Sequence, residues 1–192
     1  MRQEIINALE ELKTIALKES DPAKFLKIES YVCSLNNGKT IKREKLIKAN
    51  SDGNAVIVFP ITTDNKIILA IEPRVFTKKT VDIGFPAGYI NSNEDPIDAA
   101  KRELREETGY TSNELIHLGS FYQDQGCSAA YNHYYLALNC VKVDEQHLDD
   151  SEFIKYILVD NEELEEIINE GYMNGLNSAY ALEKGKSYLK ER

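Results

Sequence analysis

The sequence predicts an α/β protein in which a mixed β-sheet lies between helices. Two apolar runs, at 54–62 and 66–72, are continuous enough to be buried strands. The segment 95–109 has the start and stop signals of a helix and lies between strand-like segments. The resulting order of strands, helix, strands and then helices is typical of a sheet with helices on its faces.

The first fifty residues predict a helix followed by a β-hairpin. Apolar residues recur at helical spacing over 3–18, and Ser20-Asp21-Pro22 would end that helix. Such a helix could pack on the main domain or on a second copy of the chain. Residues 28–50 alternate loosely around Asn36-Asn37-Gly38, which is typical of a hairpin turn. We therefore expect a helix and hairpin extension over 1–50 and one main domain over 51–192.

The centre of the main domain is predicted to be an extended segment, a tight turn and a helix. Thr80–Phe85 leads into a turn at Pro86-Ala87-Gly88. Asp95 is a suitable N-cap, Pro96 suits the first helical position and Gly109 suits the C-cap. The apolar stripe of this helix is predicted to be Ile97, Ala100 and Leu104.

The last part of the chain is predicted to complete the sheet and to cover it. Strands are expected at 115–123, 131–143 and 153–159. Helices are expected at 161–170 and 177–190, separated by glycines.

The composition argues against several classes of protein. The net charge of −9 disfavours a general affinity for nucleic acid or for an anionic membrane. The three cysteines show no paired spacing, so we expect neither a disulfide framework nor a zinc site, but a reducing compartment. The acidic N-terminal segment does not resemble a signal peptide, and the longest apolar run is too short to cross a bilayer. We expect a cytoplasmic protein with no nucleic-acid or membrane partner.

Three carboxylates share one face of the predicted central helix. Glu103, Glu106 and Glu107 stand at i, i+3 and i+4, so their side chains lie one turn apart. They would repel one another and weaken the helix unless something offset their charge. A divalent cation is the usual partner of such an oxygen-rich cluster, and Mg²⁺ or Mn²⁺ suits it.

The block around these carboxylates carries a longer pattern. It reads Gly88, five residues, Glu94, seven residues, Arg102-Glu103-Leu104, one residue, Glu106-Glu107, one residue and Gly109. This pattern resembles the signature of the Nudix hydrolases, and its flanks supply the strand, turn and helix that the signature requires. The resemblance implies a Nudix-type α/β/α sandwich around the mixed sheet.

The resemblance also implies a reaction class and a metal site. Nudix hydrolases split a diphosphate linked to another moiety, using Mg²⁺ or Mn²⁺ and an attacking water. By motif position, Glu103 and Glu107 would be the main metal ligands. Glu106 would be a further ligand or a catalytic partner of the bound water. The carbonyl group of Ala87 would complete the metal's coordination.

Other catalytic roles follow from the same resemblance. Arg102 would orient the carboxylates by ion pairing, and Glu94 would be structural support or an outer ligand. Relatives that cleave ADP-ribose and nucleotide sugars use a Glu in a late loop as general base. Glu152 would take that role, with Asp150 as the alternative. An exposed acidic turn is the other interpretation of this segment.

The likeness outside the block is to the ADP-ribose and nucleotide-sugar pyrophosphatase branch, over roughly residues 30–190. Substrate would be contacted by Arg74 and Lys79 in a basic loop, and by Gln125 in the loop after the helix. A loop kept soluble by its charge is the other interpretation of the basic residues. That branch commonly has prolines where this chain has Gln123 and Gln125, which leaves the identity of the substrate more open than the reaction.

We therefore expect a Mg²⁺-dependent enzyme that hydrolyses a nucleoside diphosphate linked to a sugar-like moiety, such as ADP-ribose or a nucleotide sugar. One alternative is hydrolysis of nucleoside triphosphates or other small diphosphates. Another is a Nudix-like module that senses nucleotides without turnover, which the intact acidic face disfavours. The resembled branch is often dimeric, so we also predict a homodimer.

Overall fold

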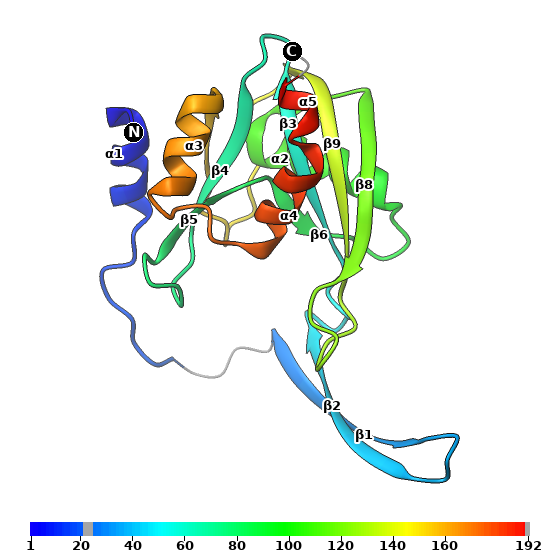
Figure 1. Cartoon of the computed structure of the whole chain (residues 1–192). Helices are drawn as coiled ribbons and strands as arrows, with labels where there is room; N and C mark the ends of the chain where they lie inside the picture. The colour runs from blue at the N-terminus through cyan, green and yellow to red at the C-terminus, as the bar shows by residue number, and fades with distance from the viewer. Residues whose placement is uncertain (21–24, 191–192) are drawn as a thin grey trace.

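The expected fold is confirmed: the chain forms an α/β/α sandwich around an eight-stranded mixed sheet (Figure 1). The computed structural model describes residues 1–20 and 25–190. The sheet consists of β3 (Ala55–Thr62), β4 (Ile67–Pro73), β5 (Val81–Gly84), β6 (Ala87–Tyr89), β7 (Tyr110–Thr111), β8 (Glu114–Tyr122), β9 (Tyr131–Lys142) and β10 (Lys155–Val159). The helices are α1 (Gln3–Leu12), α2 (Pro96–Thr108), α3 (Asn161–Asn169), α4 (Leu176–Gly185) and α5 (Ser187–Lys190).

The centre of the sheet is the parallel pair β3 and β9. The main order is β10-β4-β3-β9-β7, and β5, β6 and β8 pair with β4, β3 and β9 respectively. All pairs other than β3 with β9 are antiparallel. The β3 strand therefore has β9 on one side, and β4 and β6 on the other, which brings segments from the whole chain to one place.

Helices cover both faces because the central strands are apolar on both faces. Along β3, Val56 and Val58 pack toward α2, whereas Phe59 packs toward α4. Figure 1 shows α2 and α4 on opposite sides of the sheet. A Cβ added to Gly185 would lie 2.5 Å from the Phe59 ring, so this glycine lets α4 approach the sheet closely.

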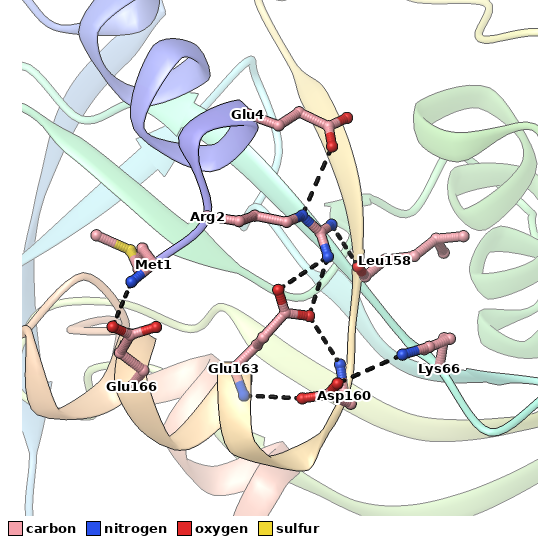
Figure 2. A network of polar contacts seen from close by, with 8 residues as sticks. All are labelled: Met1, Arg2, Glu4, Lys66, Leu158, Asp160, Glu163 and Glu166. Atoms are coloured by element: carbon pink, nitrogen blue, oxygen red, sulfur yellow. Dashed lines mark hydrogen bonds and ion pairs between the residues drawn. The ribbon is translucent and has the colours of Figure 1, made fainter.

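The first helix packs on its own domain. Ile5 and Leu9 are buried in the core on the α3 and α4 side of the sheet. The Arg2 side chain fastens the start of the helix: it donates to both carboxylate oxygens of Glu163 at 2.9 and 3.0 Å, and to the carbonyl oxygen of Leu158 at 2.6 Å (Figure 2). The α1 helix is therefore continuous with the domain core, although it lies within the predicted extension 1–50.

The predicted hairpin is formed by β1 (Leu26–Ser34) and β2 (Thr40–Lys48), which pair as a separate two-stranded sheet. It projects away from the main sheet (Figure 1). Its attachment is at the β2 end, where the backbone N–H of Leu46 donates to the carbonyl of Cys127 at 2.7 Å. One face of β1 exposes an apolar stripe, Leu26, Ile28 and Val32. This hairpin face is covered by no other described part of the chain.

The structure corrects several predicted boundaries. The helix expected over 3–18 ends at Leu12, because Thr14 instead exchanges hydrogen bonds with Thr80 and Ile15 is left exposed. The predicted break at 20–22 falls mainly outside the described residues. The turn expected at 86–88 is the start of strand β6, which pairs with β3. The helix expected over 177–190 is split into α4 and α5.

The apolar side of α2 also differs from the prediction. Ile97 is 39% exposed, whereas Ala99 joins Ala100 and Leu104 in the core against β3 and β9. Helical spacing alone could not show which of these apolar positions is buried. Ala99 is buried because a small side chain fits close to the sheet. Among the described helices, none has the length and apolar character needed to cross a bilayer.

Candidate active site

Helix α2 presents its carboxylates at two different depths. It begins at Pro96, and Gly109 closes it in the left-handed conformation, with a φ of 74°. Glu103 and Glu107 are 7% and 4% exposed, whereas the side chain of Glu106 is 41% exposed. The acidic face predicted from the i, i+3, i+4 spacing is therefore two buried carboxylates with one at their outer edge.

The Arg102 guanidinium joins the carboxylates of this region. Its Nε and Nη2 donate to the two oxygens of Glu94 at 2.8 and 2.9 Å. Its Nη1 donates to Glu103 at 2.7 Å and to Glu106 at 2.9 Å. A further bond from Nη2 reaches the Tyr89 carbonyl at 2.9 Å. Because these charge-assisted bonds point in several directions, Arg102 holds the helix against β6 and sets the orientation of two acidic side chains.

Strand β6 covers the acidic face of α2 with backbone. A Cβ added to Gly88 would lie 2.0 Å from Cδ of Glu103, so only glycine allows this carboxylate to lie against the strand. One residue earlier, the backbone N–H of Ala87 donates to Oε2 of Glu107 at 3.2 Å. The predicted role of Ala87 involves its carbonyl group, whereas the contact seen here is made by its amide.

Burial gives these carboxylates unusual proton affinities. Desolvation raises the pKa of Glu103 to about 7, even though its bonds to Arg102 act in the opposite direction. Desolvation, and then repulsion by Glu103 and Glu72, raises the pKa of Glu107 well above its usual value. Perturbed carboxylates of this kind gather at functional sites more often than elsewhere.

The carboxylates open into a cavity of about 810 Å³. Glu72, at the end of β4, and Glu152, in the loop before β10, also line it. Burial raises the pKa of Glu72, and the negative charge of Glu152 adds to the rise at Glu72, Glu103 and Glu107. Arg74 forms an ion pair with Glu72 at the same wall. Six acidic residues from three separate segments thus line one space: Glu72, Glu103, Glu106, Glu107, Asp149 and Glu152.

The cavity contains some of the residues predicted from sequence and not others. It is lined by Arg74, Ala87, Arg102, Glu103, Glu106, Glu107 and Glu152. Neither Lys79 nor Gln125 lines it: Lys79 Nζ lies 3.7 Å from the centroid of the Tyr172 ring. Asp150 is also absent from the lining, although its neighbours Asp149 and Ser151 contribute to it.

Sequence reasoning missed several polar residues of this cavity, among them Lys48, Glu72, Asn132 and Asn177. One of them had a visible signal, since Glu72 is an acidic residue at the end of an otherwise apolar strand. The two asparagines had none, because they lie in segments that only the fold brings together.

The donor set fits a hard divalent cation. Carboxylate oxygens are the ligands that Mg²⁺ and Mn²⁺ prefer, and the buried Glu107 carboxylate accepts a hydrogen bond from the Ala87 amide. Over residues 1–20 and 25–190, no three acidic, histidine or cysteine side chains already surround one point.

The comparison with protein families agrees with this geometry. A family model described as the NUDIX domain matches residues 52–175, which include the whole carboxylate cavity except Lys48 and Asn177. The chain belongs to the Nudix family. It is a Nudix hydrolase by membership, and α2 lies within the matched residues.

Nudix relatives match nearly the whole chain. An "ADP-ribose pyrophosphatase" of Bacillus subtilis is 32% identical over 93% of this chain and 94% of its own length. A "Methanol dehydrogenase activator" of Bacillus methanolicus is 33% identical over 83% of this chain and 84% of its own. Among solved structures, an "ADP compounds hydrolase" has a TM-score of 0.73 at 22% identity, covering 92% of this chain and 93% of that one. That likeness supports the fold.

Proposed function

We propose that this protein hydrolyses the diphosphate bond of a nucleoside diphosphate linked to a sugar-like moiety, in the manner of an ADP-ribose or nucleotide-sugar pyrophosphatase. The observation that carries the proposal is the pair of buried carboxylates, Glu103 and Glu107, facing Glu72 and Glu152 across one cavity. So much buried negative charge is unfavourable without a cation, and Mg²⁺ or Mn²⁺ would supply charge neutralisation and an activated water.

The roles of the chain's own residues follow from their places. Glu103, Glu107 and Glu106 would hold the cations, with the Ala87 carbonyl as a further ligand. Arg102 would keep those carboxylates oriented. Glu152 lines the same cavity as the α2 carboxylates, so it could accept a proton from the attacking water. Arg74 would offset charge on the substrate phosphates.

The substrate assignment rests on size and on relatives. A cavity of about 810 Å³ suits a ligand with groups on both sides of a diphosphate, in a range typical of small-molecule sites. The B. subtilis relative that matches nearly the whole chain is named for ADP-ribose. The net charge of −9 is compatible with an anionic substrate only when bound cations reverse the local field.

A product assay tests this proposal. The purified chain would be incubated with ADP-ribose, ADP-glucose, a dinucleoside diphosphate and ATP, each with and without Mg²⁺ or Mn²⁺. We expect AMP and a sugar phosphate from the diphosphate-linked sugars, and no turnover after chelation. Preference for ATP would support the triphosphate alternative. Binding without turnover of any compound in the presence of metal would support a sensing module and overturn the enzymatic proposal.

We also propose that the protein is a cytoplasmic homodimer whose extension, 1–50, serves the domain over 51–192 in two ways. The helix α1 completes the core, as Ile5 and Leu9 are buried there. The hairpin would contact the second copy, since its apolar stripe has no cover within the described chain. The absence of paired cysteine spacing supports a reducing compartment.

A further inference from the structure

The wall of the cavity contributed by β9 and α4 contains a buried amide whose oxygen has no hydrogen-bond partner. Asn132 lies on the central strand β9 and is 1% exposed. Its Nδ2 donates to Oδ1 of Asn177 at 3.3 Å, but its Oδ1 accepts no hydrogen bond from any residue that the structure describes. An unpaired buried carbonyl is costly, and nearly all such groups in folded proteins are satisfied. Asn132 lines the same cavity as Glu103 and Glu107, so a ligand that fills this cavity lies next to the Asn132 side chain.

The neighbouring amide has a defined orientation. Oδ1 of Asn177 accepts from the Tyr134 hydroxyl at 2.9 Å as well as from Asn132. Both lone pairs of this oxygen are therefore used, and its Nδ2 is left without an acceptor among the described residues. Burial raises the pKa of Tyr134, which keeps its hydroxyl protonated as a donor.

The result is an acceptor and a donor side by side. Oδ1 of Asn132 can accept one hydrogen, and Nδ2 of Asn177 can donate one. Hydroxyl groups satisfy such a pair well, because each can both donate and accept. A terminal phosphate satisfies it poorly, since a fully ionised phosphate offers acceptors only and would place one against the Asn132 carbonyl.

We infer that Asn132 and Asn177 bind neighbouring hydroxyl groups of the sugar-like moiety and so determine specificity for a diphosphate-linked sugar. This inference rests on the proposed function, which it deepens by assigning the residues that recognise the second half of the substrate. Tyr134 is then a positioning residue, which acts by orienting Asn177.

The test compares two substrates that share the ADP half: ADP-ribose and the methyl ester of ADP, which has no sugar hydroxyls beyond the diphosphate. The variants are Asn132→Leu and Asn177→Ala, with Asn113→Ala as a control on the exposed surface. We expect each site variant to lower kcat/KM for ADP-ribose by about tenfold and to leave the methyl ester nearly unchanged. The control should change neither value.

Equal losses for both substrates would assign the pair to the nucleoside half and overturn the inference. No loss for either substrate would overturn it as well. Binding of the two compounds to the metal-free protein, measured by calorimetry, gives the same comparison without turnover. If the unsubstituted protein binds ADP-ribose but hydrolyses nothing with metal, the proposed function fails, while the binding ratio still decides the role of the pair.

Thermal unfolding separates recognition from a structural role. Removing the unpaired oxygen in Asn132→Leu should leave the melting temperature of the free protein unchanged or raise it, because a desolvated carbonyl is lost. If Asn132→Leu does not fold, the Asn177→Ala variant tests the inference instead, since Asn177 is only half-buried at the start of α4. A loss of stability without a change in the substrate ratio would overturn the inference.

Discussion

At the scale of residues, the depth of each carboxylate decides what it can do. The Glu107 carboxylate is buried and accepts a hydrogen bond from the Ala87 amide, whereas Glu106 is at the cavity edge and paired with Arg102. Both residues look alike in the sequence. The difference arises because α2 lies against β6, whose Gly88 allows side chains of the helix to contact backbone.

The first prediction concerns Glu107→Gln. We expect kcat with metal to fall by about 100-fold or more, because the proposed metal ligand would be lost. Folding raises the pKa of Glu107, so the folded protein favours the protonated carboxyl. The stability that this protonation contributes is fully present below the ordinary pKa of 4.5 and is lost as the pH rises through the raised pKa. The neutral variant avoids that loss, so its metal-free form should be more stable than the unsubstituted protein at pH 8.

Chemical unfolding at pH 5 and pH 8, with and without Mg²⁺, measures this effect. Added Mg²⁺ should stabilise the unsubstituted protein at pH 8 and have little effect on the variant. The matched control is Glu165→Gln, on an exposed position of α3. A variant that retains near-normal activity, or that is less stable at pH 8 only, would show that Glu107 is not a buried metal ligand.

At the scale of elements, α1 behaves as part of the domain rather than as an appendage. Its apolar side enters the core, and the Arg2 contacts with Glu163 and Leu158 hold its first turn against α3 and β10 (Figure 2). The segment after it reaches the basic loop through Thr14 and Thr80. Since Arg74 begins that loop, the N-terminal segment also supports one side of the cavity.

We therefore predict that two adjacent isoleucines of α1 differ in importance. Ile5→Ala should destabilise the protein by about 2–5 kcal/mol, because Ile5 is fully buried and a cavity would remain. Ile6→Ala should cost less than about 1 kcal/mol, since Ile6 is 38% exposed. Urea unfolding measures both values. Equal effects would mean that α1 does not pack on its own domain in solution.

At the scale of the whole molecule, the hairpin is the feature that a single chain does not explain. An isolated two-stranded sheet is marginally stable in water, and this one exposes apolar residues on one face. Exposed apolar surface on a projecting element is typical of a contact with another protein. A second copy of the chain satisfies this requirement without any other partner.

The prediction at this scale is that Ile28→Asp with Val32→Asp converts the protein from dimer to monomer. The two side chains are 68% and 67% exposed in one chain, so charges there should not disturb the core. Sedimentation velocity measures the oligomeric state. The control is Ile15→Asp, at a position that is 97% exposed outside the hairpin. A doubly substituted protein that remains dimeric would exclude this stripe from the interface.

The elements that were predicted correctly from the sequence are those whose limits depend on residues close together in the chain. The limits of α2 followed from Asp95, Pro96 and Gly109, because the ends of a helix depend on residues within one turn; Asp95 occupies the N-cap position, although its side chain makes no capping hydrogen bond. The strands β3 and β4 followed from continuous apolar runs. The end of α1 was not predictable in this way, because it depends on the contact between Thr14 and Thr80, which are far apart in the chain.

The sequence by itself determined the family resemblance, the order of elements and the acidic face of α2, since all of these depend on residue types at fixed local spacing. Only the tertiary structure decided which residues share the cavity. It added Glu72 and joined Asn132 to Asn177, and it placed Lys79 over Tyr172 instead. Contacts between distant segments depend on how β3, β9 and α4 pack, and no local pattern encodes the direction in which each side chain then points.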